Sequence, residues 1–181
     1  MNKVICLLFL TAFVTSSLSF TTEEEWYKYE STKFNYSISF PGKPTKSVMK
    51  IRSVLGKIKL NMMIYNPGYA DDNLLYMVNY TAYPAGFVND GSEEFLDGFY
   101  EGAMNGAISK VDGEVISKKK IKQHGYEGRD VKFKIKDGGN ISKIRMFLIK
   151  NRMYMLQTMS EASEDGYETQ KRFFDSFDFT P

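Results

Sequence analysis

Residues 126–160 read YEGRDVKFKIKDGGNISKIRMFLIKNRMYMLQTMS, and this stretch decides the fold. Val131, Phe133 and Ile135 alternate with lysines, the two-residue period of a strand that has one buried face and one wet face. Turn-forming residues at 137–140 and 151–152 divide the stretch. It therefore predicts three consecutive antiparallel strands, at Tyr126–Lys136, Ile141–Lys150 and Met153–Ser160.

The same period continues on the amino-terminal side of this meander. A strand is predicted directly before it, at Val115–Gln123, and the first half of the chain carries four more segments of strand character. Proline, glycine, asparagine and aspartate separate these segments, as expected for turns. The four predicted strands are Phe34–Phe40, Ser47–Val54, Lys57–Tyr65 and Leu74–Tyr83.

Two segments have helical spacing instead. Ser92 is a suitable N-cap, Glu93 and Glu94 suit the helix dipole, and apolar residues then recur at helical intervals as far as Ile108. Gly98, Gly102 and Gly106 form a narrow stripe on this helix, which we interpret as close packing on a sheet; a flexible or partner-contacting helix is the alternative. A second amphipathic helix is predicted at Glu164–Phe177.

Together these elements predict an α+β domain, an antiparallel sheet of about seven or eight strands with helices packed on its faces. The 181 residues are 43% hydrophobic and 15% aromatic, which is enough to fill a core and excludes a disordered chain. One cysteine excludes a disulfide scaffold. The formal net charge of +2 does not support a strongly basic nucleic-acid binder.

The first nineteen residues are predicted to be a secretory signal peptide. Lys3 precedes an apolar run from Val4 to Val14, and small residues at Ser17 and Ser19 fit a cleavage site after Ser19. The run is shorter than the ~20 residues of a membrane span, and no later segment qualifies. We therefore expect a secreted or periplasmic protein whose single domain is residues 20–181. Because Cys6 is removed with the signal, the mature domain contains no thiol.

Several short motifs occur in an order that is typical of one protein family. They are the segment from Phe34 to Pro41, then Ile121 to Arg129, then Ile144 to Ile149, then Arg152 to Leu156, and finally Arg172 to Phe177. In this order they resemble the PsbP-like superfamily of small secreted or lumenal domains. The resemblance covers most of residues 26–180 and implies an antiparallel sheet with helices on its faces. It also implies a non-enzymatic binding or assembly role, with no catalytic residue to carry over.

Few residues suggest catalysis or metal binding. His124 is the only histidine, and we interpret it as a turn residue because no exposed serine elbow accompanies it. Asp71-Asp72-Asn73 and Asp137-Gly138-Gly139-Asn140 could supply oxygen ligands to Ca²⁺, but neither has the spacing of a calcium loop, so turn chemistry is favoured. We expect no catalytic residue, no metal and no cofactor.

One cluster of charge is distinctive. Seven lysines lie on two predicted neighbouring strands: Lys118, Lys119, Lys120, Lys122, Lys132, Lys134 and Lys136. Lysines of this kind protect the edge of a sheet against aggregation. They could instead form a basic face that binds an acidic protein or another envelope component. Nucleic acid is not an expected partner outside the cytoplasm.

The sequence therefore favours an exported, non-enzymatic binding or accessory domain of the bacterial cell envelope. Two alternatives stay open. The first is a hydrolase of envelope material that uses a pair of carboxylates. The second is a carrier of small apolar ligands, suggested by methionines at alternate strand positions, although such methionines more often fill a core. These are Met62, Met63, Met77, Met153, Met155 and Met159.

Overall fold

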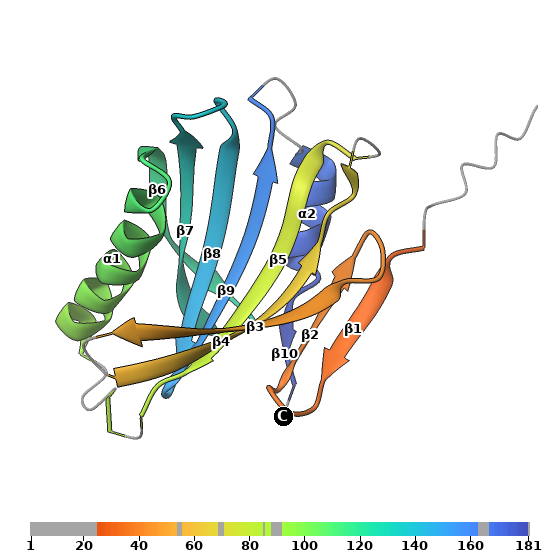
Figure 1. The fold of residues 1–181 in the computed structure, drawn as a ribbon. Helices are drawn as coiled ribbons and strands as arrows, with labels where there is room; N and C mark the ends of the chain where they lie inside the picture. The colour runs from red at the N-terminus through yellow and green to blue at the C-terminus, as the bar shows by residue number, and fades with distance from the viewer. Residues whose placement is uncertain are drawn as a thin grey trace, which may run out of the picture.

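A computed structural model describes residues 25–53, 56–68, 71–84, 86–87, 92–162 and 167–180. The predicted signal peptide lies outside these residues, so its assignment stays a prediction. Figure 1 shows the arrangement of the elements. They are β1 (Tyr27–Ser31), β2 (Tyr36–Phe40), β3 (Thr45–Ser53), β4 (Gly56–Tyr65), β5 (Asn73–Ala82), α1 (Glu93–Ser109), β6 (Gly113–Gln123), β7 (Tyr126–Ile135), β8 (Ile141–Ile149), β9 (Arg152–Ser160), α2 (Tyr167–Asp175) and β10 (Asp178–Phe179).

Seven strands form one antiparallel sheet in the order β3-β4-β5-β9-β8-β7-β6. The predicted meander is confirmed, because β6, β7, β8 and β9 pair in sequence order. β5 then joins β9, with Tyr80 directly opposite Tyr154. The sheet therefore ends at β3 on one side and at β6 on the other.

A second, three-stranded sheet has the order β1-β2-β10. β1 and β10 were not predicted from the sequence. β1 carries a mixed pattern of burial, and β10 has only two residues, so neither has a clear period of its own. Both form by pairing with β2, which is almost entirely buried. The predicted α+β class is confirmed, with strands divided between two sheets.

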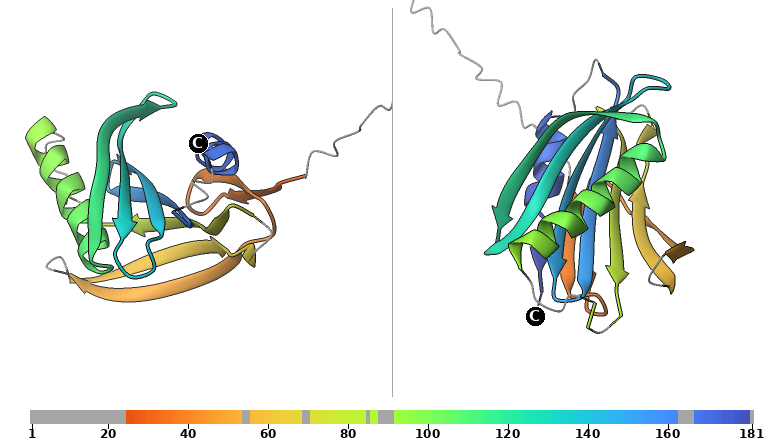
Figure 2. Two further views of the ribbon diagram at one scale, coloured as in Figure 1. Left: turned by 90° about the horizontal axis from the view of Figure 1, so that it is seen from above. Right: turned by 90° about the vertical axis from the view of Figure 1, so that its left-hand side faces the viewer.

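Each face of the large sheet is packed against a different layer (Figure 2). We call the two sides the α2 face and the α1 face. The small sheet and α2 cover the α2 face, where the core is Tyr36, Ile38, Phe40, Met63, Tyr76, Val78, Tyr80, Phe147, Tyr154, Leu156, Phe173, Phe174 and Phe177. Helix α1 covers part of the other face, where the core is Tyr100, Met104, Ile108, Val131, Phe133, Ile144, Met146 and Met153.

The carboxy-terminal segment closes the core of the α2 face. Phe173, Phe174 and Phe177 have no exposed surface, and burial of each stabilises the fold by about 1.5–3 kcal/mol. The Ser176 hydroxyl donates to the carbonyl of Phe173 and accepts from the amide of Ser39 in β2, at 2.8 and 3.0 Å. The predicted second helix is confirmed as α2, and these phenylalanines cover the sheet.

Helix α1 begins as the sequence predicts. The Ser92 hydroxyl accepts the amide of Phe95, and Glu93 and Glu94 lie in the first turn. The interpretation of the glycine stripe is wrong. Gly98, Gly102 and Gly106 are exposed, and a Cβ added to any of them would meet no atom within 4 Å. The helix instead packs through Tyr100, Met104 and Ile108.

Tyr100 fixes the position of α1 on the sheet. Its hydroxyl accepts the amide of Leu148 in β8 at 2.7 Å and donates to the carbonyl of Glu127 in β7 at 3.3 Å. The guanidinium of Arg129 lies over its ring, 4.7 Å from the centroid. Burial raises the pKa of the Tyr100 phenol, so the hydroxyl stays neutral and keeps both hydrogen bonds. None of the described helices is long and apolar enough to cross a membrane.

Candidate anion-binding site

The predicted basic face on β6 and β7 is divided between the two faces of the sheet. Lys118 lies opposite Val131 and Lys120 opposite Arg129, which places both on the α1 face. Lys119 lies opposite Asp130 and therefore on the α2 face. By alternation, Lys122 joins the α1 face, and Lys132 and Lys134 join the α2 face. Lys136 follows the end of β7 and pairs with Asp112 at 3.2 Å.

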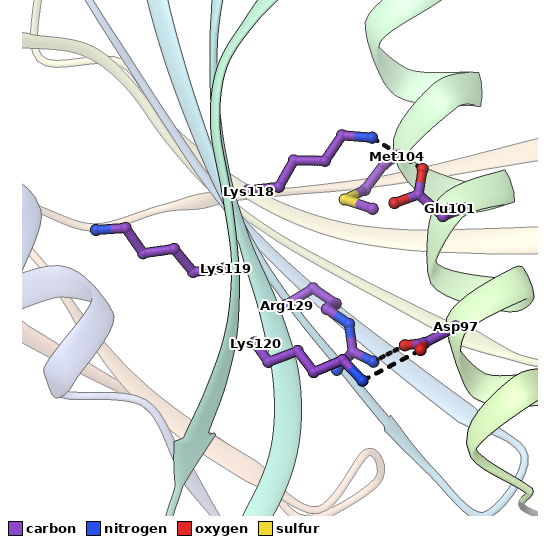
Figure 3. A pocket seen from close by; sticks show the side chains of 7 residues that line it. All are labelled: Asp97, Glu101, Met104, Lys118, Lys119, Lys120 and Arg129. Atoms are coloured by element: carbon purple, nitrogen blue, oxygen red, sulfur yellow. Dashed lines mark hydrogen bonds and ion pairs between the residues drawn. The ribbon is translucent and has the colours of Figure 1, made fainter.

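Helix α1 neutralises Lys118 and Lys120, two of the lysines on its face of the sheet (Figure 3). Lys118 pairs with Glu101 at 2.8 Å, and Lys120 pairs with Glu93 and Asp97 at 2.5 and 3.1 Å. Asp97 also pairs with Arg129. A pocket of about 340 Å³ between α1 and the two strands is lined by Asp97, Glu101, Met104, Lys118, Lys119, Lys120 and Arg129. Figure 3 shows Lys119 pointing away from the others.

The hydrogen bonds from Arg129 and Lys120 hold the pKa of the Asp97 carboxyl below its ordinary value. Asp97 therefore stays ionised and is committed to the ion pairs that bind α1 to the sheet. Glu101, one turn further along α1, is likewise occupied by Lys118. We interpret this pocket as a structural ion-pair network.

A second network lies on the α2 face. Asp130 is buried and pairs with Arg145 at 3.0 Å and Lys143 at 3.8 Å. Both cations lie over the ring of Phe174, and Arg145 also pairs with Asp175 at 3.1 Å. Burial, aided by neighbouring cations that include Arg145, lowers the pKa of the Lys143 amine. These contacts attach α2 to β7 and β8.

A larger groove lies at the other end of the α2 face and was not predicted. Its volume is about 680 Å³. β3, β4 and β5 form its floor, and the segment between β1 and β2 contributes Lys33 and Phe34. We call it the lysine groove, after Lys33, Lys46, Lys50, Lys57 and Lys59, which line it together with Phe34, Val48, Ile58, Asn61, Tyr80 and Ala82.

The described residues do not neutralise the charge of the lysine groove. No aspartate or glutamate lines it, and its five lysines form no ion pair within the part of the chain that the structure describes. Lys50 lies directly opposite Lys59, and Arg52 lies directly opposite Lys57. Like charges directly opposite one another destabilise an antiparallel pair. The fold therefore tolerates two successive repulsive pairs on one face.

The aromatic residues of the groove support its floor. Phe34 stacks on Tyr80 with 4.3 Å between ring centroids, and the Lys33 amine lies 5.4 Å from the Phe34 centroid. Tyr80 is itself buried. Both rings are thus engaged within the protein, and the lysines supply the charge of the groove.

A sequence signal for this groove exists, although it is weak. Lys46, Lys50 and Arg52 are an even number of positions apart in one strand, and Lys57 and Lys59 are two positions apart in the next. Each set therefore lies on a single face of its strand. The signal was missed because these cations are spaced apart, whereas Lys118-Lys119-Lys120 form a contiguous run that alternation divides.

The other candidate residues occupy turns. Asp71 caps the start of β5, where its carboxylate accepts the amide of Asn73 and the hydroxyl of Tyr76, both at 2.8 Å. Residues 137–140 connect β7 to β8, and His124 lies in the turn between β6 and β7 with a φ of 50°. Within the described residues, no three carboxylate, histidine or cysteine side chains are grouped to hold a metal ion.

No family model matches the sequence, and no curated protein matches it. Among solved structures, the chain is similar to the cyanobacterial PsbP protein of Synechocystis sp. PCC 6803. The identity is 12% and the TM-score 0.54, over 91% of this chain and 98% of that one. A protein of unknown function from Pseudomonas aeruginosa is matched over 77% of this chain and 85% of that one, with 7% identity and a TM-score of 0.39.

The class of the chain is thus an α+β domain with an antiparallel sheet covered on both faces. The particular fold is PsbP-like, in agreement with the resemblance that the sequence motifs carry.

Proposed function

We propose that this chain is a non-catalytic binding domain that acts in the bacterial cell envelope and binds an anionic partner in the lysine groove. The observation that carries the proposal is the set of five groove lysines, with no aspartate or glutamate among the described residues that line the groove. A cluster of uncompensated cations in a concave surface attracts anions and speeds their association. Proteins accept the repulsion within such a cluster where binding relieves it.

The absence of catalysis is part of this proposal. Asp97 and Glu101 are held in ion pairs with cations, and Asp130 is held by Arg145. A general acid needs a carboxyl that is protonated at working pH, whereas Asp97 has a lowered pKa. A screen of the purified domain against glycoside, ester and peptide substrates is expected to show no turnover. Turnover that is lost in Asp97→Asn would contradict this part of the proposal.

The binding test compares two variants with the same change of charge. Lys50→Glu/Lys59→Glu alters the groove, and Lys122→Glu/Lys134→Glu alters exposed lysines of β6 and β7. Lys118 and Lys120 are unsuitable for charge reversal because they bind α1. The first variant keeps a like-charge pair between β3 and β4, so its stability should stay close to that of the unmodified domain.

Poly-L-glutamate is the probe, measured by isothermal titration at low and at physiological ionic strength. We expect the unmodified domain to bind, and the affinity to fall as salt screens the lysines. The groove variant should lose at least tenfold in affinity, while the β6–β7 variant should keep the affinity within about threefold. Equal losses in both variants would show that net charge alone drives binding, which would refute the assignment to the groove.

A further inference from the structure

We infer that the free edge of β3 binds an extended segment of a partner protein whose side chains alternate between acidic and apolar. This inference rests on the proposed function and names the class of the anionic partner. It combines the backbone edge of β3 with the different chemistry of the two faces beside it.

β3 has an unpaired edge. It is nine residues long and stands last in the large sheet, where only β4 pairs with it among the described strands. Val48 and Met49, at its centre, are 52% and 51% exposed. An extended peptide can add to such an edge through main-chain hydrogen bonds, while its alternate side chains contact opposite faces of the sheet.

On the α2 face, an added strand would meet cations. Lys46, Lys50 and Arg52 lie along β3 on this face, with Val48 between Lys46 and Lys50, and Lys57 and Lys59 continue the row into β4. Strands have nearly the same rise per residue, about 3.3–3.4 Å, so side chains at every second position of the added strand stay in step with this row. Carboxylates at those positions would neutralise the repulsion between Lys50 and Lys59 and between Arg52 and Lys57.

On the α1 face, the same strand would meet an uncharged surface. Ser47, Met49 and Ile51 alternate along β3, and half-buried apolar residues of β4 continue the surface. These residues belong to neither core cluster. Flexible methionine side chains adapt to varied apolar partners. Apolar side chains at the intervening positions of the partner would cover the surface formed by Met49, Ile51, Leu60, Met62 and Ile64.

The charges on β3 select against two other occupants. A neutral strand would leave the cations of β3 uncompensated, and a second copy of β3 would place lysines beside lysines. At the opposite end of the sheet, β6 presents lysines on both faces, and α1 already neutralises Lys118 and Lys120. The alternating pattern therefore fits β3 and does not fit β6.

The test uses a nine-residue synthetic peptide that alternates glutamate and valine. A control peptide of the same composition groups its glutamates at one end and its valines at the other. Binding is measured by fluorescence anisotropy, and amide hydrogen exchange is followed by mass spectrometry along residues 45–53. We expect the alternating peptide to bind at least tenfold more tightly than the block peptide and to protect the amides of β3.

The possible results separate the inference about the β3 edge from the proposal about the lysine groove. Equal binding of both peptides without protection of β3 would overturn the strand inference and leave the groove proposal in place. Failure of both peptides and of poly-L-glutamate would remove the proposed function as well. Concentration-dependent protection of β3 without any peptide would show that a second copy occupies the edge, which also overturns the inference. Loss of binding of the alternating peptide in Lys50→Glu/Lys59→Glu, with retention in Lys122→Glu/Lys134→Glu, supports the inference.

Discussion

Lys50 and Lys59 lie directly opposite each other on the α2 face of the sheet, and the next pair along, Arg52 and Lys57, is also cationic. Within the described residues, Lys50 and Lys59 have no ion-pair partner. Repulsion within these pairs opposes folding, while the same charges attract an anion. Stability and binding therefore make opposite demands on the same residues.

Replacement of one lysine of this pair should stabilise the domain. In Lys59→Glu an attractive pair with Lys50 replaces a repulsive one, and we expect a gain of roughly 0.5–1 kcal/mol in the free energy of unfolding. The melting temperature should rise by about 1–4 °C at low salt and by less at high salt. Thermal denaturation followed by circular dichroism measures this, and poly-L-glutamate binding should weaken in the same variant. A lower melting temperature would contradict the claim that repulsion between Lys50 and Lys59 destabilises the fold.

Alanine in the exposed glycine stripe of α1 should also stabilise the domain. Gly102 is a helix-interior residue, and its added Cβ would meet no atom within 4 Å. Gly102→Ala should therefore raise the free energy of unfolding by about 0.5–1 kcal/mol, because glycine loses more backbone entropy on folding. Urea denaturation checks this. Gly138→Ala is the matched control and should destabilise, since Gly138 has a φ of +87°.

Gly128 should tolerate no side chain. It lies inside β7, not in the preceding turn, and a Cβ there would overlap the Met146 carbonyl oxygen and the Phe147 ring. Because the backbone of β8 must move to accept it, Gly128→Ala should cost roughly 1–3 kcal/mol. Urea denaturation of this variant beside Gly102→Ala separates the two kinds of glycine. A cost below about 0.5 kcal/mol would show that β8 shifts freely.

Asp97 should make the domain sensitive to acid. Its folded pKa lies below the ordinary carboxyl value of about 3.9, because Arg129 and Lys120 donate to the ionised form. A group with a lowered folded pKa stabilises the fold above its unfolded pKa, and this contribution is lost as the pH falls through the folded value. The unmodified domain should thus lose stability below about pH 4 more steeply than Asp97→Asn.

The acid measurement consists of melting temperatures between pH 7 and pH 2 at constant ionic strength. The pKa of the Asp175 carboxyl is lowered as well, and this residue provides a second test. Burial raises the pKa of this carboxyl, but hydrogen bonds from Lys171 and Arg145 outweigh burial and lower it. Asp175→Asn should therefore flatten the profile in a similar way, and the two variants together should flatten it further. If the melting temperatures of the unmodified domain and Asp97→Asn fell in parallel with pH, the proposed role of Asp97 in acid sensitivity would be refuted.

The export prediction can be tested on the protein made in a bacterial host. Cleavage after Ser19 should leave Phe20 as the first residue of the exported chain. Mass spectrometry of the periplasmic or secreted fraction gives the terminus directly. A variant with Ser17→Arg and Ser19→Arg should keep the leader, because signal peptidase requires small residues at these two positions. An unmodified chain that keeps Met1 in the cytoplasm would contradict the prediction.

Most of the fold could be predicted from local sequence. The strands of the meander and the start of α1 at Ser92 follow from alternation, turn residues and capping, which act between near neighbours. β1 and β10 could not be predicted, since each exists by pairing with β2. The glycine stripe was misread because spacing alone does not say which side of a helix meets the sheet.

The candidate site also depends partly on local sequence and partly on tertiary contacts. The sequence by itself determined where the lysines are and which of them share a face of one strand, because strand periodicity is local. Only the tertiary structure decided which of those charges are neutralised. Lys118 and Lys120 meet carboxylates that lie 17 to 27 residues away in the sequence, whereas Lys50 meets Lys59 across a strand pair. Coulomb interactions depend on distance in space, so the surface that we propose binds an anion became visible only once the chain was folded.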